Sequence, residues 1–162
     1  MIQERLKELR AQMQERGIDI YIVPTSDFHQ SEYVGEYFKA RKYMTGFTGS
    51  AGTAVITKEE AGLWTDGRYF IQAEKQLEGS TVKLFKMGEE GVPKVEEYVK
   101  DHLTEGSCIG FDGRVMDAKS GEKYAKMAEE KKAALYVKED LVGNIWKDRP
   151  QLPANKVWIL ED

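Results

Sequence analysis

Residues 26–70 read SDFHQSEYVGEYFKARKYMTGFTGSAGTAVITKEEAGLWTDGRYF. Within this stretch, residues 52–65 hold two β-rich runs, GTAVIT and AGLWT, separated by polar residues. Such a pair of runs predicts a β-hairpin. The same stretch crowds His29, a glycine-rich loop at 46–52 and WTDGRYF at 64–70 into turns. This concentration of unusual residue types predicts a functional site beside the hairpin.

Helical and strand patterns alternate in the rest of the chain. In residues 2–16, apolar residues recur at spacings of three and four, which predicts an amphipathic helix that ends at Gly17. Similar patterns predict helices at 67–78, 93–103 and 118–132, and strands at 18–24, 81–87, 107–112 and 133–137. Strands separated by helices favour an α/β sandwich with a mixed sheet, in which the hairpin is the antiparallel part.

The size and charge of the chain restrict the classes of function. Its 162 residues, 41% of them hydrophobic, fit one domain with a substantial core. A formal charge of −4, spread without a long block of one sign, argues against a nucleic-acid-binding surface. No apolar run reaches the roughly 18 residues of a membrane span, and the charged start, MIQERLKELR, is unlike a signal peptide. We therefore expect a cytoplasmic protein that binds neither nucleic acid nor membrane.

The candidates for catalytic or metal chemistry are weak. The loop GFTGSAGT at 46–53 lacks the lysine and hydroxyl that end a P-loop, so its glycines are assigned to tight turns and close chain approach. His29 has carboxylates nearby, but the only other histidine, His102, is distant on a charged helix, which favours a structural, hydrogen-bonded histidine over a metal ligand. No serine lies in a GxSxG elbow. Cys108, the only cysteine, is expected to be a small core residue rather than a nucleophile.

The segment WTDGRYF at 64–70 holds the strongest candidate for ligand binding. A predicted strand ends here, and a turn at the end of a strand is where α/β folds commonly place ligand contacts. Arg68 is predicted in the first turn of the following helix, where its fork of N–H donors suits a carboxylate or a peptide carbonyl. The alternative is that Asp66 caps the helix and Arg68 pairs with a nearby surface acid. Spacing alone favours this alternative.

The C-terminal part of the chain predicts a domain boundary. Pro150 and Pro153 bracket a polar, extended stretch, and the chain continues into the apolar run VWIL at 157–160. We predict one domain at 1–148 and a linker at 149–162 that leads into a second domain missing from this chain. A natural terminus is the alternative.

Four successive motifs resemble a known family: SDFHQSEY, YMTGFTGSAGTAVIT, LWTDGRYFIQAEKQL and LVGNIWKDRP. They resemble the N-terminal region of the long, cytosolic type of Xaa-Pro aminopeptidase, also called aminopeptidase P, in the creatinase and prolidase family. The likeness runs from the first helix to the linker. It implies a creatinase/prolidase N-terminal domain, a mixed sheet flanked by helices with a ribonuclease H-like motif, which is not the catalytic domain.

The resemblance also implies the activity of a longer parent protein, which releases an N-terminal residue that precedes proline. In the family, a C-terminal pita-bread domain holds two divalent metals, usually manganese, bound by two Asp, one His and two Glu, and the parent is expected to be a homodimer. Because none of those ligand motifs occurs in this sequence, we expect no catalytic residue and no metal ligand in this chain. Arg68 matches the arginine that contacts bound peptide in the family, and the resemblance assigns it to substrate binding.

Three further expectations accompany this assignment. Trp64 and Tyr69 are expected to pack in the core and fix Arg68, Asp66 to shape the turn, and His29 to be structural. A competing interpretation is a stand-alone peptide- or protein-binding module of the same fold without peptidase activity. A creatinase or prolidase proper fits less well, because GFTGSAGT and the DRP linker resemble the aminopeptidase group more.

Overall fold

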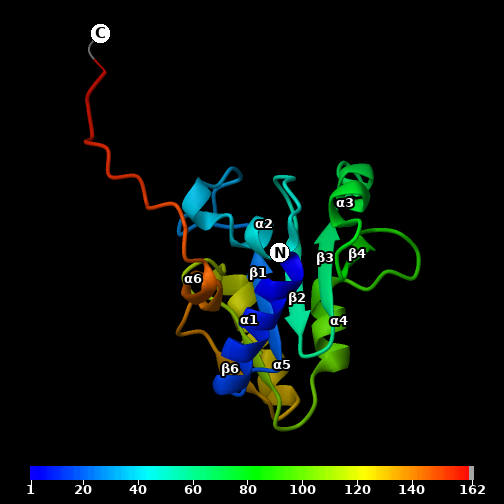
Figure 1. Ribbon diagram of the computed structural model, residues 1–162. Coiled ribbons are helices and arrows are strands. Elements are labelled where there is room, and N and C mark those ends of the chain that lie inside the picture. Colours follow the sequence, from blue (N-terminus) through cyan, green and yellow to red (C-terminus); the bar gives the residue numbers. More distant parts are fainter. Residues whose placement is uncertain (161–162) are drawn as a thin grey trace.

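The computed structural model describes residues 1–160. Its strands form one six-stranded sheet in the order β4-β3-β2-β1-β5-β6 (Figure 1). The strands are β1 (Ile20–Pro24), β2 (Thr53–Thr57), β3 (Ala61–Thr65), β4 (Val82–Lys86), β5 (Cys108–Gly110) and β6 (Ala134–Tyr136). β2 runs antiparallel to β1 and β3, and all other neighbouring strands are parallel. The predicted mixed α/β architecture, with the hairpin as its antiparallel part, is confirmed.

The β2–β3 hairpin lies in the interior of the sheet. In its register Thr53 pairs with Trp64, and Ile56 pairs with Ala61. Residues 54–56 are all buried, on both faces of the strand. Apolar side chains on both faces are typical of a strand that helices cover from two sides.

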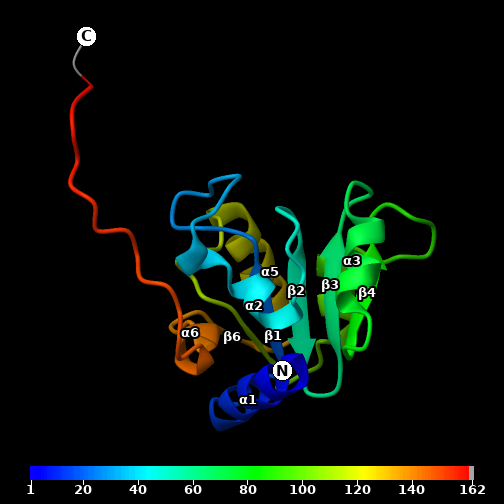
Figure 2. The same cartoon turned by 45° about the horizontal axis from the view of Figure 1, so that its top comes forward.

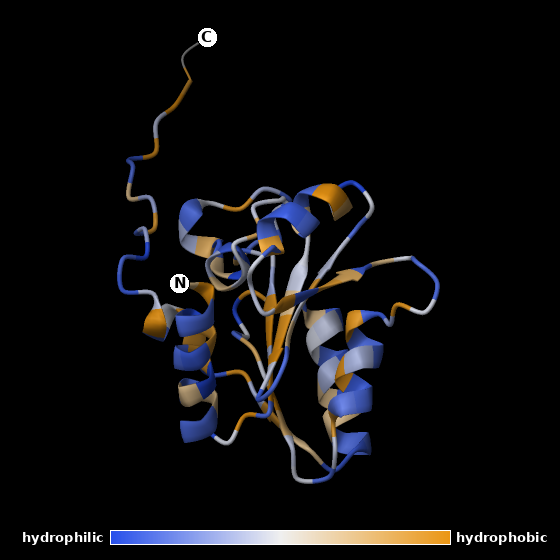
Figure 3. Ribbon diagram, turned by 45° about the vertical axis from the view of Figure 1, so that its right-hand side comes forward, coloured by the Kyte–Doolittle hydropathy of each residue, from blue (hydrophilic) through white to orange (hydrophobic). Residues whose placement is uncertain are grey.

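Helices cover both faces of the sheet. The helices α1 (Ile2–Glu15), α2 (Ala40–Thr45), α3 (Phe70–Leu77) and α6 (Leu141–Ile145) share one hydrophobic cluster with the sheet, and α4 (Val95–His102) and α5 (Ala118–Glu130) share another. Figure 2 shows α1 beside α6. Figure 3 shows largely hydrophobic strands between helices whose turns alternate between hydrophobic and hydrophilic residues.

The first helix confirms the prediction made from its apolar spacing. Leu6, Leu9 and Met13 are the buried residues of α1, and they recur on the face that packs against the sheet. Gly17 follows the helix with φ at 67°, a left-handed conformation that glycine adopts without steric cost.

Three short elements were missed by the sequence analysis: α2, α6 and a 3₁₀ helix, η1, at Glu36–Phe38. Each spans at most six residues, which is too short for a repeating apolar pattern. The apolar side chains of α2 and α6 are buried by contacts with distant parts of the chain, whereas η1 has no buried residue. Met44 of α2 and Leu141 of α6, for example, belong to the same hydrophobic cluster as α1.

The segment after α6 leads away from the rest of the domain (Figures 1 and 2). Residues 151–160 have no regular secondary structure and are exposed. The apolar side chains of Val157, Trp158, Ile159 and Leu160 are between 73% and 98% exposed. Of the predicted linker at 149–162, residues 161–162 lie outside the described part.

Buried tyrosines predict a loss of stability at alkaline pH. The pKa of Tyr98 is raised to about 12, mainly by burial and to a smaller extent by the hydrogen bond to Glu60. Burial also raises the pKa of Tyr21 and of Tyr124. Because an unfolded tyrosine loses its proton near pH 10, the folded state binds more protons than the unfolded state above that pH. The free energy of unfolding is therefore expected to be constant with respect to these groups below about pH 10 and to fall as the pH rises toward about 12.

Urea denaturation between about pH 8 and about pH 11 measures this dependence. Tyr98→Phe should make the decline shallower, since the titrating hydroxyl is removed. Tyr33→Phe is the matched control, because Tyr33 is 76% exposed. An equal decline in wild type and in Tyr98→Phe would show that Tyr98 titrates alike in both states.

Candidate functional site

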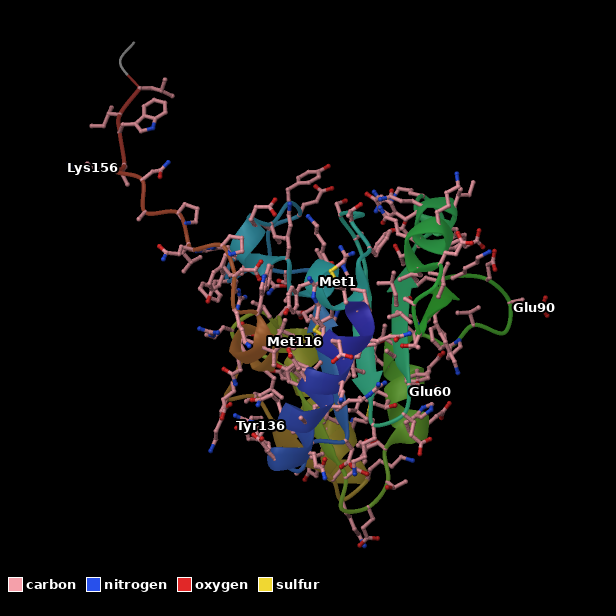
Figure 4. All side chains as sticks on the ribbon, viewed as in Figure 1. Met1, Glu60, Glu90, Met116, Tyr136 and Lys156 are labelled. Carbon is pink, nitrogen blue, oxygen red and sulfur yellow. The ribbon has the colours of Figure 1, made fainter. Side chains whose placement is uncertain are left out.

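The carboxyl ends of the parallel strands β1, β3, β4, β5 and β6 meet at one edge of the sheet, at the top in Figure 1. Antiparallel β2 begins at this same edge. β1 lies between β2 and β5, so the strands that follow it in the sequence are added first on one side of β1 and later on the other. Open α/β sheets bind ligands at such a reversal. Glu60, in the hairpin turn, marks the opposite end of the sheet (Figure 4).

Three loops that are distant in sequence come together at this carboxyl edge. They are residues 25–35 after β1, residues 46–52 before β2 and residues 66–69 after β3. The Thr25 amide donates to the Gly52 carbonyl at 3.1 Å, and the Thr65 hydroxyl donates to the Ala51 carbonyl at 2.8 Å. The unusual residues of 26–70 therefore do gather in one region, beside the hairpin.

Arg68 lies in the turn before α3 rather than in the first turn of a helix, which corrects the predicted helix at 67–78. The Tyr69 amide closes this turn onto the Asp66 carbonyl at 3.0 Å, and α3 begins at Phe70. The Arg68 amide donates to the Asp66 carboxylate at 3.1 Å, so Asp66 shapes the turn as expected. The Arg68 side chain is 65% exposed.

The Asp66 carboxylate also orients the Arg68 guanidinium. Nε and Nη2 of Arg68 donate to the two carboxylate oxygens at 2.8 and 2.9 Å. This hydrogen-bonded pair lowers the pKa of Asp66 and raises the pKa of Arg68. A guanidinium has five N–H groups, so three of them are left for another acceptor. Arg68 does pair with a nearby acid, and it can still donate to a ligand.

Tyr69 links Arg68 to the glycine-rich loop. Its ring lies 5.2 Å from the Arg68 guanidinium carbon, and its hydroxyl is 2.6 Å from the Ser50 hydroxyl. Trp64 is buried, but on the other face of the sheet, where it stacks on Phe85 at 3.9 Å. Trp64 packs in the core as expected, but in a different hydrophobic cluster from Tyr69, which lies beside Arg68, so the expectation that Trp64 fixes Arg68 is wrong.

A buried arginine fixes the glycine-rich loop. Arg41, only 4% exposed, donates from Nε to the Thr25 hydroxyl at 3.0 Å and from Nη1 to the Phe47 carbonyl at 2.8 Å. Its Nη2 donates to the Gly49 carbonyl. The sequence analysis missed this residue, because Arg41 stands between Lys39 and Lys42 in a segment without apolar periodicity.

The glycines of the loop allow the chain to approach itself closely. A Cβ atom at Gly52 would lie 2.9 Å from the Trp64 carbonyl oxygen, and one at Gly49 would lie 2.3 Å from the Phe47 ring. Gly46 ends α2 with φ at 79°. These contacts agree with the assignment of the glycines to tight turns and close approach.

A cavity opens at the same edge, on the face of the sheet that Trp64 and Phe85 share. It has a volume of about 440 Å³ and lies between the loop after β4 and the start of α5. Met87, Val95, Met116 and Tyr124 give it apolar walls.

The remaining candidates give no catalytic group. The His29 amide donates to the Asp27 carboxylate at 2.8 Å, but the imidazole is exposed, so the side chain is not the hydrogen-bonded structural group that we expected. Cys108 is buried in the core, as expected, and burial raises the pKa of its thiol. Within residues 1–160, no group of three or more His, Cys, Asp or Glu side chains could hold a metal ion. In the same residues, no helix has the length and apolar character needed to cross a membrane.

The fold and the site together define a mixed α/β domain that presents an oriented arginine at the carboxyl edge of its sheet. The chain belongs to the creatinase/prolidase N-terminal domain family, whose model matches residues 5–139. Among curated proteins it is 43% identical over 164 residues to aminopeptidase P2 of Arabidopsis thaliana, covering 98% of this chain and 23% of that protein. It is 48% identical over 158 residues to a probable Xaa-Pro aminopeptidase P of Pyrenophora teres f. teres, covering 94% of this chain and 24% of that protein. The chain thus spans about a quarter of the length of these relatives.

Solved structures agree with this family. The X-prolyl aminopeptidase of Caenorhabditis elegans, described as a cytosolic enzyme with a di-nuclear active site, superposes with a TM-score of 0.87 at 35% identity, covering 94% of this chain and 26% of that one. The N-terminal domain of the cytoplasmic peptidase PepQ of Mycobacterium tuberculosis superposes with a TM-score of 0.61 at 26% identity, covering 88% and 98% of the two chains. The second structure is that of an isolated domain, so a domain of this kind can fold by itself.

Proposed function

We propose that this chain is the non-catalytic N-terminal domain of a metal-dependent Xaa-Pro aminopeptidase, in which it shapes the substrate cleft and contacts bound peptide through Arg68. The observation that carries the proposal is the position of this side chain. Its guanidinium is exposed at the carboxyl edge, is oriented by Asp66 and keeps three N–H donors for a ligand. The relatives support the proposal, because they are named as aminopeptidases and align with nearly the whole chain.

The role of Arg68 in this proposal is binding. A guanidinium only donates hydrogen bonds, so the groups of a peptide that it can recognise are the carbonyl oxygens and the terminal carboxylate. A guanidinium that is already oriented donates to such oxygens with little further loss of side-chain freedom.

The chemistry would take place in another part of the longer protein, where two divalent metals, manganese in our proposal, would supply a hydroxide nucleophile. The residues described here do not fit such a metal pair, so no step of the hydrolysis is assigned to this chain. The predicted linker at 149–162 would lead toward that part. The exposed apolar side chains of residues 157–160 support a continuation into a further domain.

We further propose that the longer protein is a cytoplasmic homodimer that acts on peptides and binds neither nucleic acid nor membrane. The description of the C. elegans enzyme as cytosolic supports the location. The charge of −4 supports the absence of a nucleic-acid partner for this part of the protein.

Residues 1–162 alone are expected to release no amino acid from a Xaa-Pro peptide with added manganese, because residues 1–160 hold no group that could bind the metals. The longer protein is expected to release the N-terminal residue of the same peptide. Chromatography of the free amino acid measures the activity, and elemental analysis measures the bound metal.

Two outcomes would contradict the proposal. Metal-dependent turnover by residues 1–162, free of contaminating peptidase, would place catalysis in this chain. A longer protein without Xaa-Pro activity, together with tight peptide binding by residues 1–162, would favour the stand-alone binding module.

A further inference from the structure

A second cavity at the carboxyl edge adjoins the Arg68 site. Its volume is about 210 Å³, and it lies between the loop after β1 and the glycine-rich loop. Ser50 lines this cavity, and the Ser50 hydroxyl contacts the Tyr69 hydroxyl at 2.6 Å. Tyr69 in turn lies beside the Arg68 guanidinium. Ser50 and Tyr69 therefore connect the cavity to Arg68.

The buried guanidinium of Arg41 lines this cavity without an acidic partner. Its three hydrogen bonds go to a hydroxyl and two carbonyl oxygens, which are neutral, and its guanidinium carbon lies 4.6 Å from the Phe47 ring centre. Among residues 1–160, no carboxylate forms an ion pair with it. Two of its five N–H groups are not used by these bonds.

A buried charge without a counter-ion is costly, and most buried charges are paired. Burial lowers the pKa of Arg41 to about 10, which agrees with an uncompensated cation. Arg5 and Arg10, which are only partly buried, also lack a carboxylate and donate to backbone carbonyls. Arg16, Arg68, Arg114 and Arg149 each form an ion pair, including the well-buried pair of Arg149 and Asp140. Arg41 differs from them, although it is the most deeply buried.

The rim of the cavity adds further positive charge. Lys39 and Lys42 line it together with Arg41, and Glu32 is the acid among its lining residues. Lys39 is paired with Glu36, outside the lining. The exposed Lys42 lies at the rim. The Thr48 and Ser50 hydroxyls supply uncharged donors. This donor set suits a carboxylate, which accepts from both cations and hydroxyls.

We propose that the cavity lined by Arg41, Lys42 and Ser50 binds a carboxylate, and that this is the C-terminal carboxylate of a short peptide held at Arg68. The identity of the carboxylate rests on the proposed function, whereas the binding of a carboxylate does not. Arg68 would contact the middle of the peptide, and the cavity would bind its C-terminal end. The site would thereby favour short peptides with a free C-terminus.

The test begins with acetate as the probe, because it supplies a carboxylate alone. Acetate is titrated into residues 1–162, and the backbone amide signals of Thr48, Gly49 and Ser50 are followed by nuclear magnetic resonance. We expect saturable shifts that equal concentrations of chloride do not produce. Lys42→Glu should weaken acetate binding about tenfold, because the reversal replaces an attraction at the rim by a repulsion.

Lys7→Glu is the matched control. It makes the same change in net charge at an exposed position of α1 that does not line the cavity. We expect acetate to bind this variant as it binds wild type. Arg41→Lys, checked for folding by circular dichroism, should weaken binding because it keeps the charge but loses the fork. No saturable shift with acetate, or an equal loss in Lys42→Glu and Lys7→Glu, would overturn the carboxylate site.

A second arm identifies the source of the carboxylate. The tripeptide Ala-Pro-Ala and its C-terminal amide are titrated in the same way, and the free acid is expected to bind at least fivefold more tightly, since the amide lacks the charge. Equal binding of acid and amide would overturn the peptide assignment. If the longer protein lacked Xaa-Pro activity while acetate still bound residues 1–162, the proposed function would fail and the carboxylate site would stand.

Discussion

Replacing Arg149 with alanine is expected to lower the free energy of unfolding of this domain by about 3 kcal/mol, because the change removes the nearer and better buried of the two cations beside the Asp140 carboxylate and leaves only the exposed Arg114, 4.0 Å away. Nη1 of Arg149 donates to the Asp140 carboxylate, and the two side chains are 13% and 12% exposed. Nε of Arg149 donates to the Tyr37 carbonyl at 2.8 Å, and the guanidinium lies 3.8 Å from the centre of the Tyr37 ring. Arg149 thus joins the end of the domain to the loop before α2.

The Asp140 carboxylate has a second role, which increases the expected effect. It caps α6 by accepting from the Gly143 amide at 2.9 Å. Without Arg149, the carboxylate would keep only the longer contact with Arg114, and protonation or water entry at this buried place would weaken the helix cap. Loss of α6 would expose Leu141, Val142 and Ile145, which are buried against α1 and α2.

Urea denaturation of residues 1–162 at neutral pH measures the loss. Arg68→Ala is the matched control, since Arg68 and Asp66 also form a forked pair but their side chains are 65% and 37% exposed. An exposed pair contributes about 0–1 kcal/mol, so the control should be nearly neutral. If Arg149→Ala destabilised the domain no more than Arg68→Ala, the ion pair of Arg149 and Asp140 would contribute no more to stability than an exposed pair.

The sheet could be predicted from the sequence because its signals are local. Two β-rich runs around a polar turn specify the β2–β3 hairpin, and Leu6, Leu9 and Met13 specify the buried face of α1. Such patterns are complete within one element. Their boundaries are less certain, as the start of α3 shows: Asp66 accepts from the Arg68 amide and holds a turn where a helix was expected.

The glycine-rich loop could not be predicted in the same way, because distant contacts fix it. Arg41 connects the end of β1 to the loop through Thr25 and Gly49. In the sequence, Arg41 is indistinguishable from the lysines on either side, and only the fold makes it the buried one. The position of Trp64, by contrast, follows from the alternation of side chains along a strand and could have been predicted.

Replacing Arg68 with alanine in the longer protein to which we assign this domain is expected to lower kcat/KM for a Xaa-Pro peptide by roughly 10- to 150-fold. A hydrogen bond to a charged group is worth about 1.5–3 kcal/mol, and the loss appears in kcat/KM when the bond is made to substrate. Arg68→Lys should recover only part of the activity, because it keeps the charge and loses the fork. Thermal stability should change little, since the side chain is 65% exposed.

Asp66→Asn separates the two roles that Arg68 has in the structure. An amide keeps one acceptor oxygen but lacks the charge that holds the guanidinium through Nε and Nη2, so the arginine is less well oriented. We expect a smaller loss of kcat/KM than in Arg68→Ala, and no additional loss when both changes are combined. Unaltered kinetics in a folded Arg68→Ala enzyme would mean that Arg68 serves only as the partner of Asp66, and the peptide contact at this edge would have to be assigned elsewhere.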